Sequence, residues 1–229
     1  MWGNYDAALD GYATISRIIG DPAERKLAKT RHEWLSPYRG HIIFADDMED
    51  DTVSTAARWS VHPGAPETGL GNFVRVREED NYLLEGRDHY HAFANIKDTV
   101  LPEEFEVHLR FRSKSSENDG AHINIMMDDK EGRTTIGLYM AGKELSLWEE
   151  KHGRETRAVE SKQFGPQWHT LRAIVEGTQV RLFLDDKLTL NYASPRSRLF
   201  LNGFNLETLS GVIQFDDVLI FSRMPPDRR

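Results

Sequence analysis

The last strongly apolar segment of the chain, GVIQFDDVLIF at residues 211–221, carries two adjacent carboxylates, Asp216 and Asp217. Its apolar and β-branched residues predict a β-strand. Successive side chains of a strand point to opposite faces of a sheet, so both carboxylates cannot face water if one face is covered. We therefore expect at least one of these aspartates to have a partner inside the protein.

Polar side chains with hydrogen-bonding capacity also recur at every second position in three other segments. In EFEVHLRFR (104–112) the odd-numbered residues are apolar, so the even-numbered ones line the opposite face. The residues that we predict to share polar faces are His108, Arg110, Arg112, His122, Asn124, His89 and His91. If their strands belong to one sheet, these side chains combine into one ligand-binding surface with Trp148 as an aromatic platform. Two alternatives are a solvated sheet face with weak cross-strand pairs, and a zinc site made by His89, His91 and His122.

Composition narrows the class of protein. The chain has 229 residues, 39% of them hydrophobic and 29% charged, as is usual for a globular protein with a proper core. The formal charge of -8 argues against a nucleic-acid binder, which needs a basic footprint, and the absence of cysteine excludes disulfides and thiolate chemistry. No apolar run approaches the ~18 residues of a membrane span, and the start MWGNYDAALD lacks the features of a signal peptide, so neither is expected. The compartment stays open.

Two kinds of element must position these residues. Apolar residues at three- and four-residue steps predict a helical hairpin over residues 2–36, with Asp21 capping the second helix and Pro22 at its first position. From residue 40 onward, short strands separated by Gly, Asp, Asn and Pro predict an antiparallel sandwich. The expected strands are 41–48, 59–62, 73–78, 82–86, 90–96, 104–112, 121–127, 134–140, 144–150, 168–177, 179–185, 187–193 and 211–221. The predicted units are therefore a helical arm at 1–38, a β-sandwich at 39–223 and a tail at 224–229.

The order of these segments resembles a known group of folds. FADDMED, EFEVHLRFR, GAHINIMMDD and, above all, WHTLRAIVEGTQVRLFLDD resemble the concanavalin A-like jelly rolls, in particular the laminin-G-like and family-16-glycosidase-like domains related to 3-keto-disaccharide hydrolases. The resemblance covers residues 40–223 and implies an all-β, two-sheet jelly roll. WGNYDAALDGYATISRIIGDP is in turn similar to the first helix of a tetratricopeptide repeat, which predicts a protein partner for the arm.

The jelly-roll resemblance implies a role for the acidic residues. In many such folds the first and last strands lie side by side, and their oxygen atoms hold a structural calcium ion. The matching carboxylates here are Asp46, Asp47, Glu49, Asp216 and Asp217. The alternative is that these acids cap turns or pair with arginine and lysine.

The same resemblance separates two classes of function. Family-16 glycosidases carry E-x-D-x-x-E on one strand, whereas ELSLWEEK has Ser146 and Trp148 at the alternate positions after Glu144. The motif is missing, so we expect a non-catalytic carbohydrate-binding or interaction module with a glycan as its partner. A glycoside or keto-disaccharide hydrolase is the first alternative. The second is a structural subunit that docks a protein partner through residues 1–38.

Overall fold

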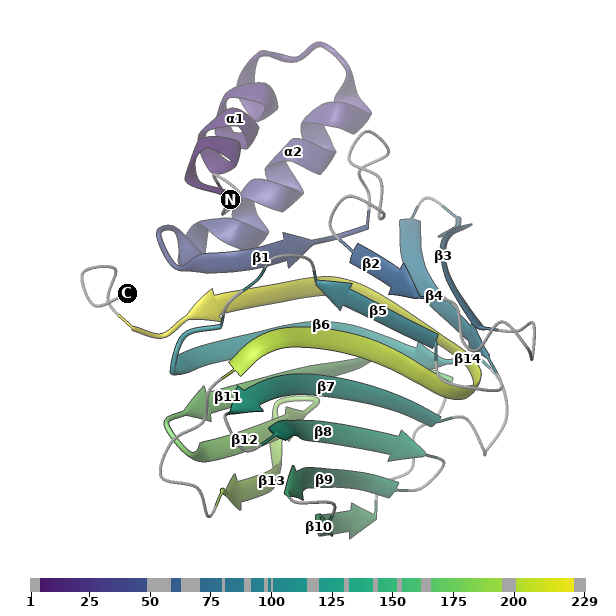
Figure 1. The fold of residues 1–229 in the computed structure, drawn as a ribbon. Helices are drawn as coiled ribbons and strands as arrows, with labels where there is room; N and C mark the ends of the chain where they lie inside the picture. The colour runs from purple at the N-terminus through teal and green to yellow at the C-terminus, as the bar shows by residue number, and fades with distance from the viewer. Residues whose placement is uncertain are drawn as a thin grey trace.

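A computed structural model describes residues 5–48, 59–62, 71–79, 81–88, 92–96, 99, 101–114, 120–129, 132–141, 144–151, 154–161, 166–194 and 201–224. It shows two antiparallel sheets packed face to face, with a helical arm on one side (Figure 1). The predicted jelly-roll sandwich with an N-terminal helical hairpin is confirmed. None of the described helices is long and apolar enough to cross a membrane.

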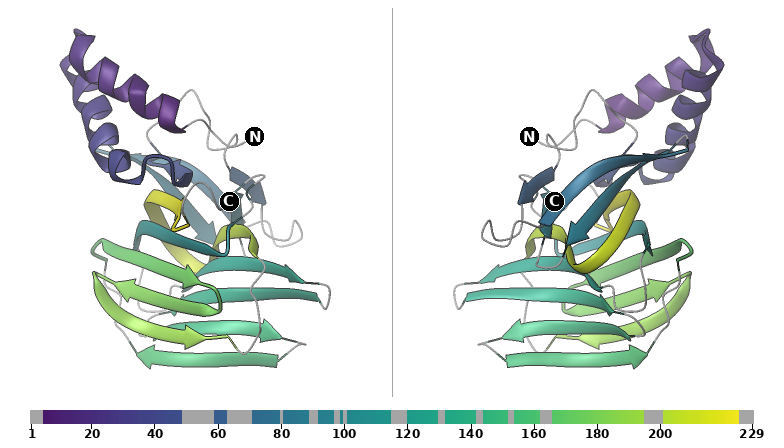
Figure 2. Two further views of the ribbon diagram at one scale, coloured as in Figure 1. Left: turned by 90° about the vertical axis from the view of Figure 1, so that its left-hand side faces the viewer. Right: turned by 90° about the vertical axis from the view of Figure 1, so that its right-hand side faces the viewer.

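The helical arm consists of α1 (Tyr5–Ile18) and α2 (Pro22–Leu35), followed by the 3-10 helix η1 (Ser36–Tyr38). The Asp21 side chain accepts a hydrogen bond from the Ala23 backbone N–H at 2.7 Å, so the predicted cap is confirmed. The arm projects from the sandwich, and only its lower end lies on the sheet (Figure 2).

The two sheets share one long strand. The strands of sheet A are β1 (Ile42–Asp46), β3 (Gly71–Glu78), β4 (Asn81–Asp88), β6 (Glu104–Ser113), β11 (His169–Glu176), β12 (Gln179–Leu184) and β13 (Lys187–Ala193). The strands of sheet B are β2 (Trp59–His62), β5 (Ala92–Ile96), β7 (Gly120–Asp129), β8 (Gly132–Ala141), β9 (Glu144–Lys151) and β10 (Arg154–Ser161). The last strand, β14 (Leu201–Ser222), pairs with β7 and β5 through its first half and with β6, β4 and β1 through its second. Gly211, at a φ of 81°, lies between the halves, where the chain passes from one sheet to the other.

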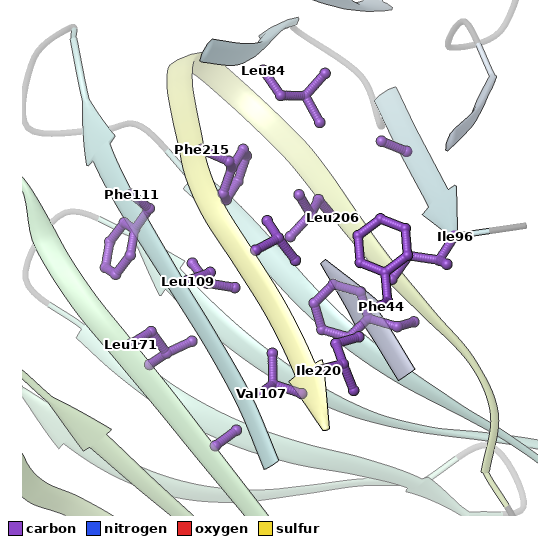
Figure 3. Packing of buried hydrophobic residues seen from close by; sticks show 14 of the residues in the cluster. Phe44, Leu84, Ile96, Val107, Leu109, Phe111, Leu171, Leu206, Phe215 and Ile220 are labelled. Atoms are coloured by element: carbon purple, nitrogen blue, oxygen red, sulfur yellow. The ribbon is translucent and has the colours of Figure 1, made fainter. Parts of the chain in front are cut away.

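The main core lies between the sheets. On β6 the odd-numbered residues Phe105, Val107, Leu109 and Phe111 are all buried, as the alternation predicts. Figure 3 shows three of them beside Phe215 and Ile220 of the neighbouring strand β14. The even-numbered residues of β6 therefore lie on the opposite side of sheet A, which we call the outer face.

A second, smaller core joins the arm to this outer face. It contains the buried residues Leu9, Leu35, Ile42, Ala45 and Leu219, with Tyr5, Tyr12, Trp34, Tyr38 and Phe221 packed against them. These residues come from both helices, from η1 and from the paired strands β1 and β14. The arm therefore covers β1 and the end of β14 and forms a wall beside the outer face of β6.

One glycine of the sandwich leaves no room for a side chain. A Cβ atom on Gly86 of β4 would overlap Thr208 Oγ1 and lie 2.9 Å from the ring of Phe73. We expect Gly86→Ala to lower the free energy of unfolding by about 1–3 kcal/mol, the usual cost of overpacking. The control is Gly11→Ala in α1, where nothing lies within 4 Å of the added atom and helix propensity favours alanine. Urea denaturation of both variants checks this, and equal stabilities would contradict it.

Candidate functional site

The two adjacent aspartates lie at a β-bulge. On the pairing of β14 with β6, Asp216 is opposite Arg110 and Leu219 is opposite His108, so β14 carries one extra residue between these pairs. Asp217 has a φ of 49°, which breaks the strand alternation at this point. Both carboxylates consequently reach the same guanidinium: Arg110 Nη1 lies 3.4 Å from Asp216 Oδ2 and 3.1 Å from Asp217 Oδ2. Arg110 is therefore the partner that we expected for at least one of these aspartates.

The bulge also lies where β14 changes neighbours. Before the aspartates β14 pairs with β4, and after them it pairs with β1. Asn81, the first residue of β4, donates a hydrogen bond to Asp216 Oδ2 at 3.0 Å. On the other side, Asp46 of β1 pairs with Val218. The next residue, Asp47, forms an ion pair with Arg31 of α2, and its charge acts on Asp217. Sheet A and the helical arm therefore meet near the three aspartates Asp47, Asp216 and Asp217.

The surroundings of the two aspartates disfavour their charged forms. Burial, followed by the charge of Asp217, raises the pKa of Asp216 to about 7, although Asn81 and Arg110 oppose the change. Burial likewise raises the pKa of Asp217, against the effect of Arg110, and the nearby charge of Asp47 adds to the rise. Only 2% of the surface of Asp216 is exposed. The buried member of the pair is therefore the one that holds a proton most readily.

A tryptophan that was not among the predicted ligand residues completes this part of the outer face. The guanidinium carbons of Arg110 and Arg112 lie 4.8 and 4.6 Å from the ring centre of Trp168, which is half-buried. Arg112 also donates a hydrogen bond to Gln214 Oε1 at 2.7 Å and pairs with Glu78. Planar donors, carboxylate acceptors and an indole are thus held in one cluster, which we call the Trp168 cluster: Trp168, Arg110, Arg112, Asp216 and Asp217.

A second charged group lies farther along the same face. Glu106 is buried and accepts hydrogen bonds from His108 Nε2 at 2.6 Å and Arg223 Nη1 at 2.8 Å, with Arg172 Nη1 at 3.5 Å. Burial tends to raise the pKa of Glu106, but the hydrogen bonds and charges of these partners outweigh it and lower the pKa. The ring of Tyr38, at the base of the arm, lies edge-on to His108 at 5.9 Å. This group ties β6, β11, the end of β14 and the arm together.

The structure corrects one part of the predicted ligand surface. The strand β6, with His108, Arg110 and Arg112, belongs to sheet A, whereas β7 and β9, which carry the other predicted ligands, belong to sheet B. The two sets therefore cannot form the single polar surface that we predicted, because the two sheets lie on opposite sides of the core. His89 and His91 lie outside the described residues.

On sheet B the backbone register still groups the predicted positions. His122 pairs with Glu207 of β14, and Asn124 pairs with Asn205. Asn205 and Glu207 alternate along β14 with the core residues Phe204 and Leu206, and both polar residues are themselves buried. Trp148 lies on β9, two strands beyond β7.

The predicted metal ligands have other partners. Asp46 is buried and accepts hydrogen bonds from Trp59 Nε1 at 3.0 Å and from a backbone N–H. Asp47 receives two hydrogen bonds from Arg31, at 2.5 and 3.0 Å. Glu49 lies outside the described residues. Within the described ranges, no three histidine, aspartate or glutamate side chains are grouped as a metal site requires.

Calcium binding by these carboxylates stays a prediction from the resemblance, and the positive charges of Arg31 and Arg110 beside them count against it. If the ion is bound, it prefers the native state and must raise the midpoint of thermal unfolding by mass action. The measurement is a thermal scan with millimolar calcium and then with a chelator. Identical midpoints under the two conditions would contradict the calcium prediction.

Comparison with known proteins supports the fold and does not identify a family. No protein-family model matches the sequence. A search of curated proteins also finds no match. Solved structures do match: a Bacillus subtilis protein described as galectin-like in fold has a TM-score of 0.61 at 8% identity, and the match covers 79% of this chain and 96% of that one.

Two further structures have carbohydrate-related names. A family 16 endo-glucanase from Bacteroides ovatus has a TM-score of 0.58 at 10% identity, over 78% of this chain and 100% of that one. The carbohydrate binding module CBM66 from Bacillus subtilis has a TM-score of 0.53 at 15% identity, over 66% and 92% of the two chains. At these identities the matches show a shared fold, which is the concanavalin A-like jelly roll.

Proposed function

We propose that this protein is a non-catalytic carbohydrate-binding module, and that its glycan binds at the Trp168 cluster on the outer face of sheet A. The observation that carries the proposal is the placement of Arg110 and Arg112 over the ring of Trp168, beside the carboxylates of Asp216 and Asp217. A sugar ring offers an apolar face for an aromatic ring and hydroxyls that both donate and accept hydrogen bonds. The cluster supplies all three kinds of group.

Partial exposure of the cluster is consistent with ligand access. The side chains of Arg110 and Asp217 are 40% and 35% exposed, so both can contact a ligand without rearrangement of the sheet. Their mutual ion pair orients the guanidinium donors before a ligand arrives, which reduces the entropy lost on binding. The carbohydrate-related names among the structural matches make a glycan the first ligand class to test.

Single substitutions on the two sheets test which face binds. We expect Arg110→Ala on sheet A to weaken binding by about tenfold or more, because a charged hydrogen bond contributes about 1.5–3 kcal/mol. His122→Ala on sheet B should leave the affinity unchanged. Binding to a panel of laminari-, cello-, xylo-, manno- and fructo-oligosaccharides is measured by calorimetry. Loss of affinity in His122→Ala alone would place the ligand on sheet B and contradict the assignment.

One observation favours hydrolysis as a second candidate function. Glycosidases use two carboxyl groups, of which one is held protonated at the working pH. Asp216, with its pKa raised to about 7, lies next to Asp217. The depth of Asp216 favours binding instead, because a buried carboxyl cannot reach a glycosidic oxygen. Release of reducing sugar from the same panel, abolished in Asp217→Asn, would establish the hydrolase.

The protein partner predicted for residues 1–38 stays a prediction. The far end of the arm exposes apolar side chains, among them Ile18 at 76%, Ile15 and Leu27. An assembly that depends on the arm should dissociate when Ile18 is replaced by Ser, and size-exclusion chromatography with light scattering measures this.

A further inference from the structure

The helical arm and the edge of sheet A enclose a small pocket apart from the Trp168 cluster. Its lining includes Tyr5, Ala8 and Tyr12 of α1, Arg31 and Trp34 of α2, and Asp47 after β1. The pocket is open to solvent and has a volume of about 50 Å³. That volume holds roughly three or four waters at ~15 Å³ each, or the hydroxyl-bearing edge of one ring.

The lining of the pocket combines aromatic rings with a rigid pair of charged groups. Tyr5 and Tyr12 belong to one side of α1, seven residues apart, and Trp34 faces them from α2. Arg31 and Asp47 form a two-bond ion pair, and their side chains are only 12% and 15% exposed. The guanidinium of Arg31 also lies 5.6 Å from the ring centre of Tyr12. A fixed donor beside a fixed acceptor, next to aromatic surface, matches neighbouring hydroxyls on a sugar ring.

A series of contacts connects this pocket to the Trp168 cluster. Asp47 directly follows the last paired residue of β1, Asp46, which lies opposite Val218 of β14, and the charge of Asp47 acts on Asp217. Asp217 in turn binds Arg110, whose guanidinium lies against Trp168. Charged groups that act on one another therefore connect the arm pocket with the outer face of sheet A.

We infer that the arm pocket is a second sugar subsite, occupied by a distal residue of the same oligosaccharide that binds at the Trp168 cluster. This inference rests on the proposed function. The arm then has a role in recognition: it adds a wall with its own aromatic and charged groups, so that the protein selects long chains over short ones. When one oligosaccharide occupies both subsites, its second contact forms within a complex that already exists. An oligosaccharide that is long enough to reach both subsites therefore binds more tightly than a shorter one.

The test compares oligosaccharides of increasing length. Calorimetry measures how tightly the wild-type protein binds the di- to hexasaccharides of each sugar in the panel. The same affinities are measured for two variants. Ala8→Leu fills the pocket without removing a contact, and Ala7→Leu, on an exposed part of the same helix, is the matched control. We expect the wild type and Ala7→Leu to bind the longest chains at least about tenfold more tightly than the shortest, and Ala8→Leu to lose this gain.

A second variant covers the case in which Ala8→Leu disturbs the arm. Trp34→Leu removes the aromatic surface but keeps an apolar side chain against the small core, and thermal unfolding identifies whichever variant retains the wild-type midpoint. An undiminished length-dependent gain in that variant would overturn the second subsite while leaving the proposed function intact. Absence of binding by the wild type to every oligosaccharide would instead reject the proposed function itself, and the inference with it.

Discussion

Replacing Trp168 by alanine is expected to weaken glycan binding by about thirtyfold or more. The indole lies against both Arg110 and Arg112, so its loss removes the aromatic surface and one of the contacts that hold each guanidinium group. Central aromatic residues of binding sites commonly contribute about 2 kcal/mol or more, which corresponds to about thirtyfold in affinity. Calorimetric titration with the tightest-binding oligosaccharide measures the change.

Two control variants separate this effect from general damage. Trp168→Phe keeps an aromatic surface and should retain most of the affinity. Arg39→Ala removes an exposed arginine that pairs with Asp10 in the arm, away from the cluster, and should bind as the wild type does. If Trp168→Ala binds as tightly as the wild type, the Trp168 cluster is not the ligand site.

Replacing Asp216 by asparagine is expected to stabilise the protein at pH 8 and to reduce the pH dependence of its stability. The pKa of Asp216 rises from 3.8 to about 7 on folding, so between these values the folded state keeps a proton that the unfolded chain has lost. The free energy of unfolding therefore falls as the pH rises through this window. At about 1.4 kcal/mol per pKa unit the full effect is on the order of 4 kcal/mol. Asparagine keeps the shape of the side chain without the charge.

The matched control for this prediction is Asp186→Asn. Asp186 is exposed in a turn with a φ of 62°, a conformation that asparagine also adopts, and the substitution changes the net charge by the same amount. Urea denaturation of the three proteins at several pH values from 4 to 8 gives the comparison. A lower stability of Asp216→Asn at pH 8 would show that the ionised Asp216 and Arg110 stabilise the fold.

Local patterns predicted much of this structure. The alternation of apolar and polar residues on β6 predicted that His108, Arg110 and Arg112 share one face. The capping residue Asp21 predicted where the second helix begins. Both patterns were reliable because they depend only on near neighbours in the chain. The strand β10 was not predicted, since RETRAVES alternates little in polarity. The first half of β14 was also missed, since glycine and asparagine interrupt its apolar residues.

The remaining features depend on pairing between segments that are distant in the sequence. Membership of β6 and β7 in different sheets follows from how β14 crosses between them, which no local pattern encodes. The positive φ of Asp217 overrides strand alternation. The alternation therefore predicted that at least one aspartate has a partner inside the protein, but it could not identify Arg110 as that partner. The role of Trp168 could not be predicted from its own segment, because the two arginines that contact its ring come from β6, which is distant in the sequence.

On the proposed function, the outer face of sheet A binds a glycan without cleaving it. The most direct measurement is calorimetric titration of the wild type and Trp168→Ala with the oligosaccharide panel, followed by chromatography of the sugar recovered from each mixture. We expect saturable binding by the wild type, at least about thirtyfold weaker binding by Trp168→Ala, and recovery of intact oligosaccharide. Equal binding by the two proteins, or recovery of shortened sugars from the wild-type mixture, would contradict it.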